Sequence, residues 1–274
     1  YGKSPELGNA SFRDPHDTGT GSTQPSPHPF DHSGHGTHVT GTLVQDTNDG
    51  AGTAGLAPEA TIIPVKVCHP PGCASDSIAA GVYWAIDHGA DIINMSFGGS
   101  VISNVEREAF ATAEEADILV VAAAGNGGGD FVGDPQLHYP AALETVVAVG
   151  AVDLAKNRAN YSNFGSGEGD GLHVMAPGGN TRVDLDGDGF KDGILQNTYA
   201  FTCDGGPPDY KAFKECMNLG TSMATPHVSG VAALILSAFP GLTADKLRTV
   251  LGCSAMDLGA VGERTGPPRG PSMT

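Results

Sequence analysis

Three short strings in the sequence carry side chains that could perform nucleophilic catalysis. His35 opens HGTHVTG, Asn126 closes AGN, and Ser222 lies within GTSMATPH. A serine hydroxyl becomes an effective nucleophile when an imidazole removes its proton. An asparagine amide can donate a hydrogen bond to the oxyanion that forms on an attacked carbonyl. The combination indicates acyl transfer, with His35 as general base, Ser222 as nucleophile and Asn126 as oxyanion donor.

Each of these residues has a simpler interpretation when it is taken alone. A serine before a helix is commonly an N-cap, and an asparagine after a strand is commonly a turn residue. An exposed histidine before a helix needs no catalytic role. The catalytic interpretation therefore depends on the three strings occurring together and in this order.

Alternating strands and helices are predicted to position the three strings. Residues 118–124 and 145–152 are apolar at successive positions, which is typical of parallel strands covered on both faces. We expect an α/β, doubly wound, mostly parallel sheet with helices on both faces and the strings at the carboxyl ends of its strands. Further strands are expected at 60–67, 90–96 and 172–175, and helices at 75–88, 104–115, 221–238 and 243–251.

Two regions lack this alternation. Residues 1–34 are rich in Pro, Gly, Ser, Asp and His, and we expect an extended surface segment there. Residues 153–219 contain Gly and Asp clusters, and we expect long loops at the functional edge rather than a second domain. A single domain over residues 1–274 is therefore predicted.

Composition excludes several classes of protein. The 14 basic and 31 acidic residues give a formal net charge of −17, which disfavours a nucleic-acid partner. No apolar run approaches the length that a membrane-spanning helix needs. Charged residues make up only 16% of the chain, which argues against disorder. A globular protein with neither membrane nor nucleic-acid partner remains.

The strings HGTHVTGT, AAAGN and GTSMATPH resemble the histidine, oxyanion-hole and serine motifs of the subtilisin-like serine peptidases, the subtilases. The segment 96–99 resembles the strand that binds the substrate backbone and lines the S1 pocket. The resemblance runs from about residue 32 to residue 253. The substrate-binding residues that it implies are Ser96, Phe97, Gly98, Ala124 and Gly125.

The resemblance also implies a subtilisin-like fold and a secreted endopeptidase that cleaves polypeptides through an acyl-enzyme. A monomer, a parent protein with an N-terminal pro-segment, and the absence of any organic cofactor are expected from it as well. An inactive subtilase-fold binding module is the alternative, because the aspartate of the catalytic triad is not evident.

The catalytic triad needs a carboxylate, and the resemblance places it in a D-[ST]-G string at the end of an apolar strand, roughly 30 or more residues before the histidine. Asp17-Thr18-Gly19 has these letters but precedes His35 by only 18 residues. The preceding residues 13–16 do not have the pattern of a buried strand. We therefore expect that the first strand is missing and that the chain starts just downstream of the triad aspartate. Residues 263–271 also depart from the family pattern, as truncation or a shifted reading frame would produce.

The segment 184–192 follows the first nine positions of a calcium-binding loop, D-x-D-x-D-G-x-x-D. Its predicted ligands are Asp184, Asp186, Asp188, the carbonyl of Phe190, and Asp192. The twelfth position is Leu195, where such loops carry glutamate, so a weak Ca²⁺ site is expected. An acidic turn without metal, or a calcium-dependent adhesion module, are the alternatives.

Five cysteines occur in the chain, and an odd count fits an exported protein with two disulfides and one spare thiol. Cys68 and Cys73 flank a Pro-Gly turn, and Cys203 and Cys216 lie in one predicted loop. We expect the pairs 68–73 and 203–216, with Cys253 left free.

Overall fold

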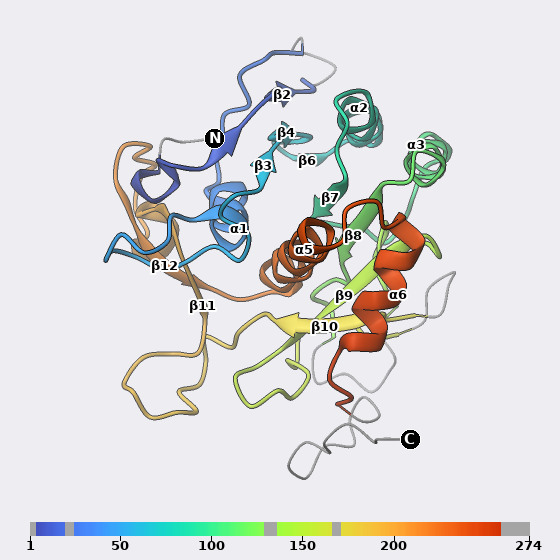
Figure 1. The fold of residues 1–274 in the computed structure, drawn as a ribbon. Helices are drawn as coiled ribbons and strands as arrows, with labels where there is room; N and C mark the ends of the chain where they lie inside the picture. Colours follow the sequence, from blue (N-terminus) through green and yellow to red (C-terminus); the bar gives the residue numbers. More distant parts are fainter. Residues whose placement is uncertain (1–3, 20–24, 129–135, 166–170, 259–274) are drawn as a thin grey trace.

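The computed structural model describes residues 4–19, 25–128, 136–165 and 171–258 (Figure 1). Its centre is a parallel sheet of order β10-β9-β8-β7. The strands are β7 (Ile92–Met95), β8 (Leu119–Ala123), β9 (Val146–Val152) and β10 (Val174–Pro177). Strand β10 begins two residues after the start expected for it at residue 172.

Successive residues of β8 enter two different cores, because side chains of a strand alternate between the two faces of the sheet. Val120 and Ala122 pack with α2 (Ser75–Asp87) and α3 (Asn104–Glu115). Leu119 and Val121 pack with α5 (Thr221–Ala238) and α6 (Ala244–Ser254). The prediction of an α/β sheet with helices on both faces is confirmed.

Helix termini follow local capping chemistry. Ser103 and Glu106 form a reciprocal capping box at the start of α3, and the Thr243 hydroxyl accepts from the Lys246 amide at the start of α6. Helix α1 (His35–Val44) instead follows Gly34, whose φ of 76° lies in the left-handed region. A Cβ on Gly34 would lie 2.6 Å from Thr198 Oγ1, so glycine is required there on both counts.

The N-terminal region contains more regular structure than expected. After the short helix η1 (Pro5–Leu7), β1 (Ser11–Phe12) pairs in parallel with β3 (Thr61–Ile62). Strand β2 (His16–Asp17) pairs in parallel with β4 (Val65–Lys66). The expected strand over 60–67 is therefore two short strands. No buried strand was expected before Asp17, and β2 is a two-residue, half-buried strand that pairs with the edge of β4.

The region 153–219 also contains more than loops. Strands β11 (Ile194–Tyr199) and β12 (Phe213–Asn218) form an antiparallel hairpin, with α4 (Phe201–Asp204) near its tip. The disulfide Cys203–Cys216 joins the tip to β12, and Cys68–Cys73 joins β5 (Cys68–His69) to β6 (Gly72–Cys73). Both predicted pairs are present, and Cys253 is exposed and unpaired.

Strands β4 and β7 each have a strand partner on one edge only, among the residues that the structure describes. Strand β4 pairs with β2 and β7 pairs with β8, and no pairing joins β4 to β7. Figure 1 shows β3 and β4 on one side of this interval and β7 on the other. None of the described helices is long and apolar enough to cross a membrane.

Candidate active site

Ser222 lies in the first turn of α5, where backbone N–H groups lack intrahelical acceptors. Its hydroxyl donates to the carbonyl of Ser96 at 2.9 Å. Ser96 follows directly after β7, so this bond brings the expected substrate-binding segment to the nucleophile. The carboxyl end of the sheet and the start of α5 therefore meet at Ser222.

The side chain of Asn126 is held in place through its amide oxygen, Oδ1. The Thr221 amide and the Thr221 hydroxyl both donate to Asn126 Oδ1, at 2.9 and 3.0 Å. An ideal Cβ on Gly220 would lie 3.5 Å from Asn126 Nδ2 and 3.6 Å from the Ser222 amide nitrogen. Two N–H donors thus flank the small space that Gly220 leaves open. Paired donors of this kind are what an oxyanion requires.

The predicted substrate-binding residues come together around the same point. The Gly125 amide donates to Thr221 Oγ1 at 3.2 Å, and Ala124 lies at the end of β8. Position 98 requires glycine, because a Cβ there would lie 2.8 Å from the carbonyl oxygen of Tyr139. Ser96 is buried, while Phe97 is half-buried beside it.

His35 is the first residue of α1 and is positioned by the loop before it. Asp31 accepts hydrogen bonds from the amides of Ser33, Gly34 and Thr37 and from the hydroxyls of Ser33 and Thr37. Burial acts to raise the pKa of Asp31, but the bonds from Thr37 and the neighbouring amides hold it below its usual value. Its negative charge therefore stays beside the start of the helix.

The ring of His35 has no hydrogen-bond partner among the described residues, and its side chain is exposed. The protein atoms that crowd it lower its pKa, and the nearby charge of Asp31 opposes this shift. A lowered pKa keeps the imidazole neutral near pH 7, which is the form that a general base needs.

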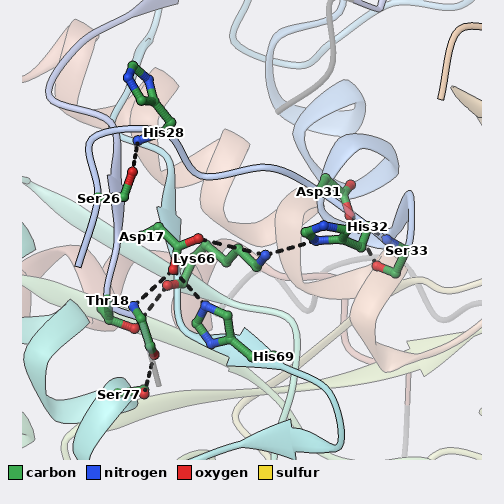
Figure 2. A network of polar contacts seen from close by, with 11 residues as sticks. Asp17, Thr18, Ser26, His28, Asp31, His32, Ser33, Lys66, His69 and Ser77 are labelled. Atoms are coloured by element: carbon green, nitrogen blue, oxygen red, sulfur yellow. Dashed lines mark hydrogen bonds and ion pairs between the residues drawn. The ribbon is translucent and has the colours of Figure 1, made fainter. Parts of the chain in front are cut away.

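Asp17 does not contact His35. Its Oδ1 lies 2.6 Å from His69 Nε2, and its Oδ2 lies 3.7 Å from Lys66 Nζ. Figure 2 shows that Lys66 lies between Asp17 and His32, with Lys66 Nζ 3.0 Å from His32 Nδ1. Burial acts to raise the pKa of Asp17, but the Gly19 amide and His69 lower it. In this structure the Asp17 carboxylate is therefore engaged by His69, Lys66 and the Gly19 amide.

Several structural residues of the site were not singled out from the sequence. The Tyr161 hydroxyl lies 2.8 Å from the carbonyl oxygens of Gly178 and Gly179 and accepts from the Gly220 amide at 3.1 Å. Burial raises the pKa of Tyr161 well above its usual value, so this hydroxyl stays protonated. No sequence pattern marks Tyr161. Thr221 lies inside the serine string, and its position before Ser222 was the available signal.

The second histidine of HGTH joins α1 to the hairpin. His38 Nε2 lies 3.1 Å from the Ile194 carbonyl and 3.0 Å from the Cys216 carbonyl. Burial lowers the pKa of His38 to about 4, so the ring stays neutral and can donate to only one of them at a time. His38 is therefore a packing residue, and His35 is the base candidate in this string.

The acidic loop brings three of its predicted ligands together. Carboxylate oxygens of Asp184, Asp186 and Asp188 lie within 4.8 Å of one another. Asp184 accepts from the amides at 187 and 189, and Asp192 accepts from the amide of residue 185. Carboxylate oxygens in a tight exposed turn are the donors that Ca²⁺ prefers. The residues present therefore fit a calcium ion.

Comparison with known proteins identifies the family. The model of the Subtilase family matches residues 4–269.

The chain belongs to the subtilase family.

Its relatives include Subtilisin DY of Bacillus licheniformis, which is 40% identical over 230 residues, covering 84% of this chain and 73% of that protein. A thermostable alkaline protease of Halalkalibacterium halodurans is 38% identical over 240 residues. That match covers 87% of this chain and 56% of the alkaline protease, so the chain spans little more than half of this relative. A solved structure titled as proteases from Pseudoalteromonas arctica superposes with a TM-score of 0.77 at 29% identity, over 91% of this chain and 79% of that one.

Membership makes this subtilase a serine endopeptidase of the subtilisin type, with the α/β fold of its relatives. The predicted family and fold class are confirmed.

Proposed function

We propose that this subtilase hydrolyses peptide bonds of polypeptides through an acyl-enzyme on Ser222. The arrangement around Gly220 carries this proposal, because Asn126 Nδ2 and the Ser222 amide flank one open space beside the nucleophile. In the first step His35 removes the hydroxyl proton while Ser222 Oγ bonds to the substrate carbonyl carbon. The carbonyl oxygen takes up the negative charge between the two N–H donors. His35 then gives the proton to the leaving amine, and water repeats the sequence to release the acid.

Substrate alignment is assigned to the two segments beside Ser222. Residues 96–98 present backbone groups at the end of β7, and residues 124–125 present them at the end of β8. We infer that an extended substrate lies along Ser96, Phe97 and Gly98, with its reacting side chain toward Ala124 and Gly125. Because Ser222 Oγ donates to the Ser96 carbonyl in this structure, that hydroxyl must turn toward His35 before it can attack.

The Asn126 assignment is tested by the rate of covalent capture by a fluorophosphonate. Asn126→Leu removes the donor but keeps the volume, and we expect the capture rate to fall by roughly 10²- to 10³-fold. That range comes from a subtilisin, a member of the same family. Thr221→Val removes one of the two bonds to Asn126 Oδ1 and is expected to slow capture less, whereas Thr221→Ser keeps the hydroxyl. Equal rates for Asn126→Leu and the unmodified chain would remove Asn126 from the mechanism.

An inactive binding module is the second candidate, and one observation favours it. No carboxylate among the described residues is hydrogen-bonded to the ring of His35, and the charge that acts on it comes from Asp31. Without an oriented imidazole, subtilisin-type catalysis loses most but not all of its rate. Complete resistance of Ser222 to the fluorophosphonate would favour the binding module.

We also propose that residues 184–192 bind Ca²⁺, with Asp184, Asp186, Asp188, Asp192 and the Phe190 carbonyl as ligands. The clustered carboxylates support this, and the ion would neutralise their mutual repulsion. Leu195 in place of an acidic twelfth ligand favours the weak range of about 10⁻⁴–10⁻³ M. Such a site suits an exported protein, and the two disulfides support export.

Calcium at a hundredfold excess over its Kd is expected to stabilise the fold by about 2.7 kcal/mol, because the ion binds only the folded loop. The measurement is a thermal melt at increasing Ca²⁺ concentrations, with EGTA as the reference. Asp186→Ala should lose the calcium-dependent rise in Tm. Asp209→Ala removes an exposed carboxylate outside the loop and should keep it. Parallel curves for Asp186→Ala and the unmodified chain would identify the loop as an acidic turn without metal.

The proposal also covers domain organisation, oligomeric state, cofactors and partners. The match over residues 4–269 supports a single peptidase domain. A formal net charge of −17 supports a monomer, since like-charged copies repel each other. The proposed chemistry uses only side-chain and backbone groups of the protein and needs no organic cofactor. We expect an N-terminal pro-segment in the parent protein and no nucleic-acid or membrane partner.

A further inference from the structure

His138 lies where the two proposed substrate-binding segments are joined. Its amide donates to the Ala124 carbonyl at 2.9 Å, and the backbones of Gly99 and Tyr139 exchange two hydrogen bonds of 2.9 and 2.8 Å. Residues 138–139 therefore connect the segment after β7 with the segment after β8, and these two strands are neighbours in the central sheet (Figure 1). His138 belongs to none of the three catalytic strings.

The side chain of His138 packs against both segments. An ideal Cβ on Gly125 would lie 2.9 Å from His138 Cγ and 2.9 Å from His138 Nδ1. An ideal Cβ on Gly98 would lie 3.2 Å from His138 Cβ. The imidazole therefore lies beside Gly125 and its stem lies beside Gly98. The His138 side chain takes up the space that the two glycines leave.

The position of His138 relative to the nucleophile follows from the contacts along each segment. Ser222 Oγ donates to the Ser96 carbonyl at 2.9 Å. His138 meets this segment two residues later, at Gly98, and it meets the other segment at Ala124, two residues before the oxyanion donor. A substrate side chain that passes between the two segments from Ser222 would therefore approach the imidazole.

The imidazole of His138 is available to a ligand. The residue is half-buried, and neither ring nitrogen has a hydrogen-bond partner among the residues that the structure describes. Asn163, which also packs against Gly125, is buried and engaged at both ends of its amide. Its Nδ2 donates to the Gln136 carbonyl at 2.8 Å, and its Oδ1 accepts from the Gly127 amide at 2.7 Å. Asn163 thus fixes the wall, and the ring of His138 is left for a ligand to contact.

The chemistry of the ring selects a class of side chain. In either charge state an imidazole offers at least one N–H donor, and an apolar side chain would leave that donor without a partner. A side chain that carries an oxygen acceptor is therefore favoured. The formal net charge of −17 disfavours a carboxylate, so an amide oxygen remains. Two residues of extended chain span roughly 7 Å, which favours the longer glutamine over asparagine.

We propose that His138 forms the end of the pocket for the side chain at the cleaved bond and selects glutamine there. The ring donates a hydrogen bond to the amide oxygen of the glutamine, and its volume excludes the larger aromatic side chains. This inference rests on the function proposed above, because it names the substrate residue that is presented to the same Ser222.

The probes are acetyl-Ala-Ala-Pro-X diphenylphosphonates, in which X is the phosphonate analogue of Gln, Glu, Met or Phe. Phosphorus takes the place of the attacked carbonyl carbon. Ser222 Oγ bonds to phosphorus, and one phenoxide leaves and takes up the hydroxyl proton as phenol. A small alkyl fluorophosphonate has no X side chain, so its capture rate is the reference for each variant. Intact-mass spectrometry measures every rate.

We expect the Gln probe to be captured about tenfold faster than the Met probe of similar length, which is the effect of one hydrogen bond. The Glu probe should be captured more slowly than the Gln probe. His138→Phe keeps an aromatic ring without nitrogens and should abolish the advantage of Gln over Met. His138→Gly opens the end of the pocket and should raise the capture of Phe relative to Met at least tenfold. His28→Phe removes an exposed imidazole elsewhere and should leave all ratios unchanged.

Failure of the pocket assignment and failure of the proposed function give different results. Equal capture of the Gln and Met probes, or an unchanged preference in His138→Phe at an unchanged reference rate, would overturn the role of His138. Faster capture of Glu than of Gln would overturn the assignment of glutamine. Failure of the fluorophosphonate to label Ser222 would contradict the proposed function, and a binding measurement then decides on His138.

That measurement follows the NMR signals of the His138 ring in Ser222→Ala while the product peptides acetyl-Ala-Ala-Pro-Gln and acetyl-Ala-Ala-Pro-Met are added. The peptide ending in glutamine should shift the ring signals at lower concentration than the peptide ending in methionine. Equal shifts with the two peptides, or no shift with either at millimolar concentration, would overturn the pocket assignment.

Discussion

Replacing Ser222 with alanine is expected to abolish covalent capture by a fluorophosphonate and peptide hydrolysis with it. The substitution removes the atom that forms the acyl bond, and the helix N-terminus and Asn126 remain. Loss of the nucleophile in a subtilisin, a member of this family, costs about 10⁶ in kcat. Intact-mass spectrometry measures the modified fraction over time, and peptide mapping locates the modified residue.

Ser237→Ala is the matched control for this experiment. Ser237 lies near the end of the same helix and is exposed, so its loss should leave the capture rate unchanged. Capture that persists in Ser222→Ala, or that maps to another residue, would contradict the acyl-enzyme proposal. Because the readout is covalent, it detects Ser222 even when the imidazole is poorly oriented and turnover is slow.

Gly55→Ala is expected to destabilise the fold by about 3 kcal/mol, the upper part of the range for overpacking. A Cβ at this position would lie 2.6 Å from the Val44 amide nitrogen and 2.7 Å from the Val44 carbonyl carbon. These are backbone atoms at the end of α1, so no side chain can rotate aside. The amides of Gly55, Leu56 and Ala57 donate to the carbonyls of residues 45, 42 and 43, and the displaced loop would leave those acceptors unsatisfied.

Urea denaturation measures this change in the free energy of unfolding. Gly252→Ala is the matched control, because Gly252 lies in α6 with nothing within 4 Å of its ideal Cβ position. Alanine has the higher helix propensity, so this variant should gain about 0.5 kcal/mol. An unchanged midpoint for Gly55→Ala would show that the loop moves freely away from α1.

The central sheet was predictable because its strands carry a strong local signal. Residues 118–124 are apolar without interruption and residues 146–152 contain only apolar side chains and one glycine, which is typical of strands covered on both faces. The short strands around Asp17 have no such signal. His16 and Asp17 are strand residues because the edge of β4 is available to them, and a sequence pattern does not report an available edge.

Some residues of the candidate site could be identified from the sequence and others could not. His35, Asn126 and Ser222 were identified because each lies in a distinctive string at a junction between elements. Asp31 and Tyr161 were not singled out, for two different reasons. Asp31 makes a local capping contact with amides two to six residues downstream, and an aspartate before a helix is too common to mark a site. Tyr161 joins the segment after β10 to the start of α5, and only the fold brings these backbone groups near it.

The bonds around Asn126 also bear on the chemical ageing of this subtilase. An asparagine followed by glycine loses its amide when the next backbone nitrogen attacks the side-chain carbonyl carbon, and Asn126 is followed by Gly127. Here the Gly127 amide donates to Asn163 Oδ1 at 2.7 Å, while Asn126 Oδ1 is held by Thr221. Neither reacting group is free to close the five-membered ring. The bonds that aim the amide at its ligand therefore also protect it from conversion to a carboxylate, which could not donate at all.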